Sequence, residues 1–262
     1  MTRLQGYGQY CPLAKGAEVF AERWTPLVLR ELLRGSSSFN DLHRGVPRMS
    51  RSLLSSRLRK LELCGVLLRR DTRRGREYHL TEAGRALAPV VTQLGSWGQR
   101  WYRSRFEADE LHPGVLMWDM RCTVDPQSLS GTRTVVQFSF LGAKPGERDW
   151  WLVNEDGEVD LCPEDPALAV DLLVTTDLRT MTRVWMGDES LDVALRSHRL
   201  ELAGPRELRR RFAAWLHRSP YAALADTDRH RQYAPRQGLT PAGRTGRRNA
   251  ALEAARAAHA PR

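Results

Sequence analysis

The chain has 262 residues, enough for about two domains that each bury a core of their own. Its four cysteines show neither CxxC nor Cys/His clustering, so we expect reduced thiols, no disulfide framework and no metal site. No stretch approaches the ~20 apolar residues that cross a bilayer, and the N-terminus has no apolar signal region, so the sequence predicts a cytoplasmic protein without a membrane partner.

The net charge of +10 is unevenly spread along the chain. Residues 1–106 hold 20 Lys and Arg against 8 Asp and Glu, residues 107–224 hold 13 against 20, and residues 225–262 hold 8 against 3. An arginine-rich genome raises the number of basic residues, but it does not explain the changes of sign. The pattern predicts two domains, 1–106 and 107–224, and a basic, disordered tail at 225–262. The first segment is the candidate for binding a polyanion.

Three helices are predicted at the start of the chain. Pro12 is tolerated in the first turn of a helix, and a mostly apolar run follows it. Thr25 is a suitable N-cap for a second helix, with Pro26 in the first helical position. Ser38 begins a shorter capped helix, which ends before Pro47.

A fourth helix is predicted after Ser50, its N-cap, with leucines spaced for burial on one side. Its other side carries arginines and serines in place of the Glu and Lys of an ordinary solvated helix. Arginine binds a guanine edge through two hydrogen bonds, and serine contacts bases or phosphates without bulk. The predicted DNA-binding residues of this helix are Ser50, Arg51, Ser52, Ser55, Ser56 and Arg59.

A β-hairpin is predicted next, from the segments VLLRR and REYHL around the polar loop DTRRG. A hairpin beside a helix that enters the major groove reaches the flanking backbone, where arginines neutralise phosphates or enter the minor groove. The alternative is a solvated charge run, which the basic side of the preceding helix makes the weaker explanation. The arginines of this hairpin are Arg69, Arg70, Arg73, Arg74 and Arg76.

A long helix closes the first segment in this interpretation. Thr81 is its predicted N-cap, and apolar residues recur from Glu82 to Phe106 with a mild interruption at Pro89.

Residues 10–101 resemble the HxlR family of bacterial winged-helix regulators, which are relatives of the MarR type. The matching stretches are Cys11-Pro12, ERWTPLVLRELLRGSSSFNDL, MSRSLLSSRLRKLELCGVL and REYHLTEAGRALAPVV, with Trp97-Gly98 beyond them. The resemblance implies an N-terminal winged helix-turn-helix that binds double-stranded DNA and regulates transcription, with repression the usual sign in the family. It also implies a homodimer built from residues 12–21 and 82–106 that reads an operator with two-fold symmetry.

The sequence departs from the family at two places. Ala21-Glu22 stand where many relatives have two glycines, and Arg48 stands where they have one. We expect DNA binding to survive both changes, with Arg48 adding a phosphate contact.

Cys11 is a candidate redox sensor, because some family members sense oxidants through the cysteine at this position. A thiolate is favoured near a helix N-terminus. The alternative is a structural cysteine, since no resolving cysteine lies nearby in the sequence.

From Leu111 the chain changes to β-branched and aromatic runs, which predict an antiparallel sheet. The runs are VLMWDMRCTV, TRTVVQFSFLG, RDWWLVNEDG and EVDLCP. A further strand is predicted at 171–175 and helices at 177–186, 191–196 and 206–216. The fold class is therefore α+β, a winged helix-turn-helix followed by an α+β domain with an antiparallel sheet.

Residues 111–212 are similar to the sterol carrier protein type 2 fold. The carrying features are DWWLVNEDGEVDLCPEDP, DLRTMTRVWMGDESLDVAL and HRLELAGPRELRRRF, in which Gly187-Asp188 precede a helix. The resemblance implies a sheet with helices on one side and an apolar tunnel between them. The candidate pocket residues are Trp118, Phe138, Phe140, Trp151, Trp185 and Met186, with ordinary core packing as the alternative role for each.

No GxSxG, HExxH, P-loop or dinucleotide motif occurs, so we expect no enzyme and no cofactor. The leading hypothesis is a regulator whose second domain binds an apolar small-molecule effector and thereby alters DNA binding. One alternative is a carrier of lipids or other hydrophobic ligands whose N-terminal domain serves dimerisation. Another is a regulator whose second domain is a ligand-free interaction module.

Overall fold

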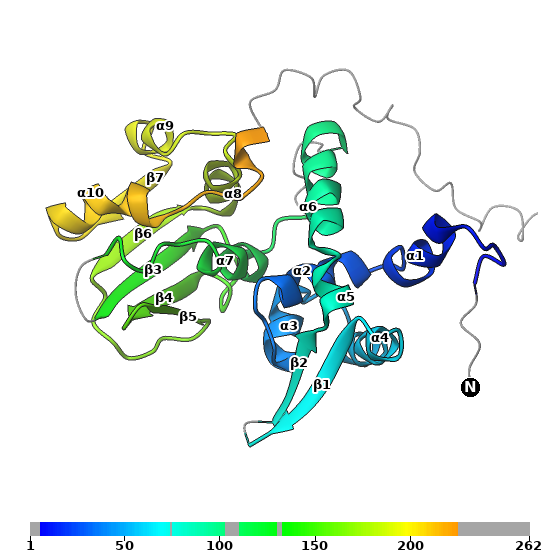
Figure 1. Ribbon diagram of the computed structural model, residues 1–262. Coiled ribbons are helices and arrows are strands. Elements are labelled where there is room, and N and C mark those ends of the chain that lie inside the picture. Colours follow the sequence, from blue (N-terminus) through cyan, green and yellow to red (C-terminus); the bar gives the residue numbers. More distant parts are fainter. Residues whose placement is uncertain (1–5, 74, 103–109, 130–132, 225–262) are drawn as a thin grey trace, which may run out of the picture.

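A computed structural model describes residues 6–73, 75–102, 110–129 and 133–224. The polypeptide is organised around two main hydrophobic cores, one among the N-terminal helices and one around a five-stranded sheet. Figure 1 shows the two parts side by side, with a two-stranded hairpin extending away from both. No helix in the described ranges is long and apolar enough to cross a bilayer.

The N-terminal part is a winged helix-turn-helix. Its elements are α1 (Pro12–Phe20), α2 (Thr25–Leu33), α3 (Phe39–Gly45), α4 (Arg51–Leu63), β1 (Leu67–Thr72) and β2 (Gly75–Leu80). Buried residues of α2 and α4, among them Leu29 and Leu58, meet in one core. The two strands pair antiparallel and form the wing.

Three of the predicted helix caps are confirmed. The hydroxyls of Ser38, Ser50 and Thr81 accept hydrogen bonds from backbone N–H groups three residues further on. The predicted cap at Thr25 is wrong by one residue. The N-cap of α2 is Trp24, which has a positive φ of 76°, and Thr25 is the first helical residue.

The long helix predicted from Glu82 to Phe106 is divided. The structure has α5 (Glu82–Arg85), α6 (Ala88–Trp97) and a π-helical turn, η1 (Gly98–Tyr102). Pro89 lies in the first turn of α6, where a proline ring fits and its missing N–H costs nothing. It therefore starts a new helix, and the predicted residues 103–106 lie outside the described part of the chain.

The C-terminal part contains a five-stranded sheet in the order β5-β4-β3-β6-β7. Its strands are β3 (Arg133–Leu141), β4 (Asp149–Glu155), β5 (Glu158–Cys162), β6 (Leu172–Asp177) and β7 (Leu200–Ala203). The strand predicted at 171–175 is confirmed as β6. The sheet is mixed, however, because β3 and β6 run parallel. The prediction of an antiparallel sheet is wrong at this pair, since residues 163–171 carry the chain across to the far side of β3.

The three helices predicted after β6 are confirmed as α8 (Leu178–Met186), α9 (Leu191–Arg196) and α10 (Arg206–Trp215), and a short 3-10 turn follows, η2 (Ala222–Leu224). Aromatic rings join α10 to the sheet, and the ring centre of Phe138 lies 6.4 Å from those of both Phe212 and Trp215. Helices therefore cover the sheet face that carries Phe138.

The run VLMWDMRCTV does not form the predicted strand. It lies largely in a helix, α7 (Pro113–Arg121), which begins with a proline in its first turn. Leu116 and Met120 of α7 enter the C-terminal core, while Trp118 and Asp119 contact residues of α2. The helix is apolar on several sides because it is buried between two parts of the molecule, and this hides the helical period in the sequence.

Candidate nucleic-acid interface

Helix α4 has the orientation expected of a recognition helix. Its inward leucines, Leu54 and Leu58, are at most 1% exposed and fix the rotation of the helix against the first core. The six residues predicted to contact DNA are all exposed: Ser50, Arg51, Ser52, Ser55, Ser56 and Arg59. The structure thus gives them one shared, solvent-facing side.

Two of these side chains are already engaged within the helix-turn-helix. Arg51 donates a hydrogen bond to Asn40 Oδ1 at 2.7 Å, and its guanidinium lies 5.1 Å from the ring centre of Phe39. The hydroxyl of Ser50 caps the helix. Arg59 forms no ion pair with any described residue, so its guanidinium is free for an external partner.

A basic pair on α4 was missed by sequence reasoning. Arg57 and Lys60 both form ion pairs with Glu22 in the turn before α2, at 2.5 Å for Lys60. Arg57 is buried, and hydrogen bonds from Arg57 and Lys60 lower the pKa of Glu22. Glu22 therefore holds α4 in place, and Arg57 does not face solvent with Arg59.

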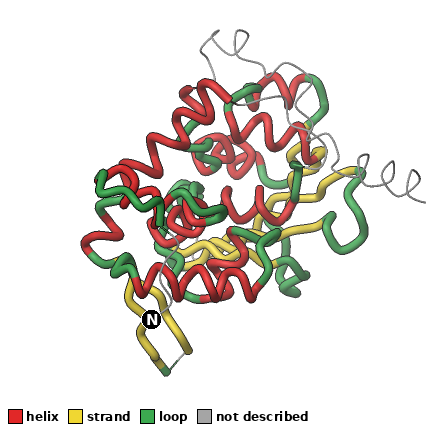
Figure 2. The backbone as a smooth tube through the Cα atoms, turned by 90° about the vertical axis from the view of Figure 1, so that its right-hand side faces the viewer, coloured by secondary structure: helices red, strands yellow, loops and turns green. Residues whose placement is uncertain are grey.

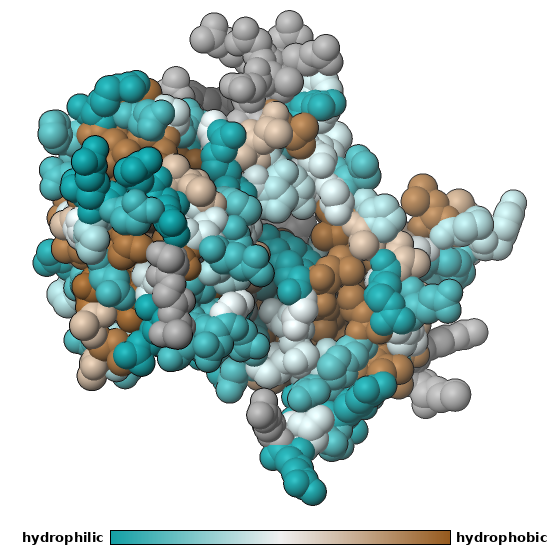
Figure 3. All heavy atoms as spheres, turned by 60° about the vertical axis from the view of Figure 1, so that its left-hand side comes forward, coloured by the Kyte–Doolittle hydropathy of each residue, from teal (hydrophilic) through white to brown (hydrophobic). Residues whose placement is uncertain are grey.

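The wing extends beyond the rest of the molecule at the lower edge of both backbone views (Figures 1 and 2), and its tip is hydrophilic (Figure 3). Arg69, Arg70 and Arg73 are exposed, whereas Arg76 pairs with Asp71 across the strands at 3.4 Å. The predicted phosphate contact Arg74 lies outside the described residues. The backbone carbonyl of Ser37 accepts a hydrogen bond from Tyr78 N at 2.9 Å, which ties the wing to the loop before α3.

Helices α1 and α6 carry exposed apolar side chains. No residue of α1 is buried, and Leu13 is 81% exposed. On α6, Val90 and Leu94 are each 45% exposed, close to the exposed Trp97. These two helices are the ones that the resemblance assigns to the dimer.

Cys11 lies at the N-cap position of α1 and is exposed. The other free thiols are Cys64, Cys122 and Cys162, and no disulfide joins any of the four. A redox role for Cys11 stays a prediction.

The six predicted pocket residues do not surround one space. Phe138, Phe140 and Trp185 are buried in the second core, and Met186 packs against it. Trp151 points to the opposite face of the sheet, where it packs with Val135 and Val153. Trp118 lies where α7 meets α2. The six residues therefore lie in three separate environments and do not line one common tunnel.

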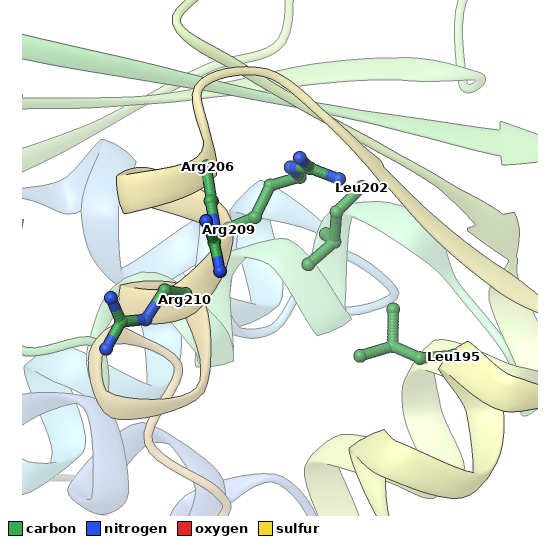
Figure 4. A pocket seen from close by; sticks show the side chains of 5 residues that line it. All are labelled: Leu195, Leu202, Arg206, Arg209 and Arg210. Carbon is green, nitrogen blue, oxygen red and sulfur yellow. The ribbon is translucent and has the colours of Figure 1, made fainter.

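The C-terminal part has a shallow cavity of about 360 Å³ between α9, β7 and α10. Figure 4 shows its lining, in which Leu195 and Leu202 are accompanied by Arg206, Arg209 and Arg210. None of the six predicted pocket residues lines this cavity. Across the described residues, no cluster of His, Cys, Asp and Glu could hold a metal ion.

The two parts of the molecule are joined by a buried polar cluster between α2 and α7, here called the seam: Arg30, Glu31, Arg34, Trp118 and Asp119. The Glu31 side chain is fully buried and accepts hydrogen bonds from Trp118 Nε1 at 2.8 Å and Arg30 Nε at 2.7 Å. Arg34 pairs with Asp119. The seam therefore attaches the sheet region directly to the helix-turn-helix.

A second attachment lies at α6. A side-chain carbon added at Gly95 would overlap the ring of Tyr221, so the absence of a side chain lets the segment after α10 pack against this helix. The C-terminal part thus contacts both the helix-turn-helix and a helix of the expected dimer.

Comparisons with known proteins match the N-terminal part. The HxlR-like helix-turn-helix family matches residues 19–106. The HTH-type transcriptional regulator YvaP of Bacillus subtilis (strain 168) is 35% identical over 102 residues, which cover 37% of this chain and 94% of YvaP. The HTH-type transcriptional regulator Rv3095 of Mycobacterium tuberculosis is 41% identical over 95 residues, or 34% of this chain and 58% of Rv3095.

Among solved structures, the crystal structure of PA1607 shares 27% sequence identity with a TM-score of 0.36, covering 38% of this chain and 72% of PA1607. The match to nearly all of YvaP, together with the winged helix-turn-helix described above, shows that this chain belongs to the HxlR-like helix-turn-helix family.

Proposed function

We propose that the protein is a transcriptional regulator that binds double-stranded DNA as a homodimer. The observation that carries this proposal is the placement of exposed Ser and Arg side chains on α4 next to a wing with exposed arginines. A helix of this kind fits the major groove, and the wing reaches the adjoining backbone. Relatives named as HTH-type transcriptional regulators support the same function.

Sequence discrimination is assigned to the exposed side of α4. Arg59 has no partner among the described residues and can contact a guanine edge, while Ser52, Ser55 and Ser56 are short enough to let the helix approach the bases. Arg51 is stacked on Phe39, so its role in this proposal is to brace α4 against α3 and to contact phosphate from that position.

Non-specific affinity is assigned to the wing. Arg69 and Arg76 lie on one face of the two-stranded ribbon, Arg70 lies on the other, and Arg73 is at the tip. Arg69 and Arg73 have no acidic partner among the described residues. Each arginine that reaches a phosphate releases condensed counterions, so the affinity of the wing for DNA should fall as salt rises.

Dimerisation is assigned to the apolar side chains of α1 and α6. Exposed side chains such as Leu13 and Leu94 lose contact with water when a second copy covers them, at roughly 25 cal/mol per Å² of apolar surface. A dimer with two-fold symmetry would present two copies of α4 to one face of the duplex. Repression is the proposed outcome, because a protein bound to its operator blocks access to that DNA.

The test is selection of bound duplexes from fragmented genomic DNA by the full chain, followed by footprinting. We expect a protected site with two half-sites about 10 to 10.5 base pairs apart, or a multiple of that spacing. Leu94→Glu should abolish the paired footprint, whereas Leu141→Glu, at a residue 52% exposed in the sheet region, should leave it intact.

Duplex binding no tighter than heparin binding would refute the regulator and favour the carrier of hydrophobic ligands. A single half-site bound by a monomer would refute the dimer alone. A promoter fusion carrying the selected site then tests repression, through loss of reporter signal when the protein is expressed.

A further inference from the structure

A cavity of about 220 Å³ opens next to the seam, between the helix-turn-helix and the sheet region. Residues His43, Arg44 and Pro47 contribute from α3 and the turn after it. His112 and Trp118 contribute from the start and middle of α7, and Trp150 contributes from β4. Both parts of the molecule therefore build this space, and Figure 1 shows α7 between the sheet and the N-terminal helices.

The walls of the cavity favour a flat ring. Two indoles line the cavity: Trp150, which is half-buried, and Trp118, which is 2% exposed. Gly114 also lines the space, and a side-chain carbon there would lie 3.1 Å from Trp150 Cη2 and 3.3 Å from His112 Cε1. The missing side chain keeps this corner open. The volume is below the ~300 to 1,000 Å³ of most drug-sized sites, which limits the occupant to about one ring.

The polar groups of the cavity favour an anion. The described lining contains one arginine and two histidines but no acid. His112 Nδ1 is buried and has no hydrogen-bond partner among the described residues, a costly state. When this nitrogen carries the ring proton, it can donate a hydrogen bond to a ligand oxygen. The Arg44 guanidinium lies 5.8 Å from the ring centre of Trp118 and is shared with Asp41, at 3.1 Å.

We propose that this cavity binds a small monocyclic aromatic anion, with its ring against Trp118 and Trp150 and its charged group toward Arg44 and His112. The site is distinct from the tunnel that the sterol carrier resemblance implies, because its walls come from both parts of the chain. Of the six residues expected to line that tunnel, only Trp118 lines the cavity.

Occupancy of the cavity would act on the recognition helix. The carbonyl of Met49, the residue before the N-cap Ser50, accepts a hydrogen bond from His43 Nε2 at 3.0 Å. Pro47 of the same turn lines the cavity. A ligand that displaces His43 or Pro47 therefore moves the start of α4. In this step, which rests on the proposed DNA binding, the aromatic anion lowers operator affinity by about 5- to 150-fold, the usual range of allosteric coupling.

In the binding test, benzoate is titrated into the full chain without DNA, and binding is measured by isothermal titration calorimetry. We expect one saturable benzoate site per chain and at least tenfold weaker binding of benzyl alcohol, which keeps the ring but lacks the charge. Arg44→Gln should weaken benzoate binding at least fivefold. Arg196→Gln changes an exposed arginine on α9, away from the cavity, and should leave binding unchanged.

Gly114→Ala fills the open corner and should also weaken binding, with circular dichroism checking that this variant folds. Arg44 is exposed, so its variant provides the test even when Gly114→Ala misfolds. No saturable benzoate site in the folded parent, or equal affinity in the parent and Arg44→Gln, would overturn the proposal. Because this assay contains no DNA, its result is independent of operator binding.

The coupling is tested separately by titrating the selected operator with and without saturating benzoate. A shift of fivefold or more in the parent, absent in Arg44→Gln, supports it. An unchanged operator affinity in a protein that binds benzoate overturns the coupling to α4 while the binding site stands.

Discussion

The two parts of this molecule use their side chains in opposite ways. In the winged helix-turn-helix, leucines such as Leu54 and Leu58 fill the core and the residues assigned a function face water. In the sheet region, large aromatic side chains such as Phe138 and Trp215 are fully buried. A row of exposed Arg and Ser side chains indicates a binding surface, whereas buried aromatic residues indicate only a hydrophobic core. Functional residues of the second part are therefore harder to identify from its sequence.

The largest expected effect is that of a substitution in the seam, which joins the two parts. Trp118→Ala removes a side chain that is 2% exposed and leaves the buried Glu31 carboxylate without its indole donor. We expect a loss of about 3 to 5 kcal/mol in the free energy of unfolding. Urea denaturation followed by circular dichroism should show two transitions instead of one, because the two cores become uncoupled.

The control for the seam is Leu141→Ala, at an exposed position in β3, which should cost less than about 1 kcal/mol. A Trp118→Ala protein with parental stability and a single transition would show that the two parts are coupled by other contacts.

The recognition helix provides the next test, since its outward face should affect binding and not folding. Arg59→Ala should cost about 1 to 3 kcal/mol in binding to the selected operator and relax discrimination at one base position. The measurement is fluorescence anisotropy on the selected site and on single-base variants. Arg196→Ala is the matched control, and an equal loss on unrelated duplexes would reassign Arg59 to phosphate contact.

The ion pairs of Glu22 should affect the stability of the fold, in contrast to Arg59, which should affect DNA binding. Glu22→Gln should destabilise the fold by about 1 to 2 kcal/mol, a value discounted because the carboxylate is 40% exposed while Arg57 is buried. The folded-state pKa of Glu22 is lowered, so this stabilisation is present above the ordinary glutamate pKa of 4.5 and is lost as the pH falls through the lowered value.

Stability measured by urea denaturation from pH 7 to pH 3 should therefore show parent and Glu22→Gln converging at the acidic end. A difference that stays constant over this range would mean that the carboxylate charge is not what stabilises α4.

The wing should give the smallest effect. Arg73→Ala should weaken binding to all duplexes about equally and make the slope of log affinity against log salt shallower by about 1. Lys144→Ala, in the acidic sheet region, should leave the slope unchanged. A change confined to one DNA sequence would instead place Arg73 in base readout.

Local chemistry explains what could be predicted from the sequence. Ser38, Ser50 and Thr81 cap helices through their own hydroxyls, and the leucine period of α4 fixes which residues face outward. These signals need no knowledge of the rest of the chain. The exposed side of α4 and the hairpin after it were accordingly predicted correctly, and DNA contact by either stays a prediction.

Long-range contacts explain what could not be predicted. Helix α7 was mistaken for a strand because it is buried between two parts of the molecule and lacks a polar side. The parallel pairing of β3 with β6 depends on the path of residues 163–171 across the sheet. Glu22 and its partners Arg57 and Lys60 are 35 or more residues apart in sequence, and no local pattern links them.

The contact between Gly95 and Tyr221 affects how the protein can be divided into fragments. A fragment ending near residue 106 would expose the α6 surface that Tyr221 covers, and it would leave the Glu31 carboxylate open to solvent on α2. Such a fragment would differ from YvaP, 94% of which is matched by 102 residues of this chain. We therefore expect the N-terminal part to depend on the C-terminal part for its stability, so DNA binding should be measured on the full chain.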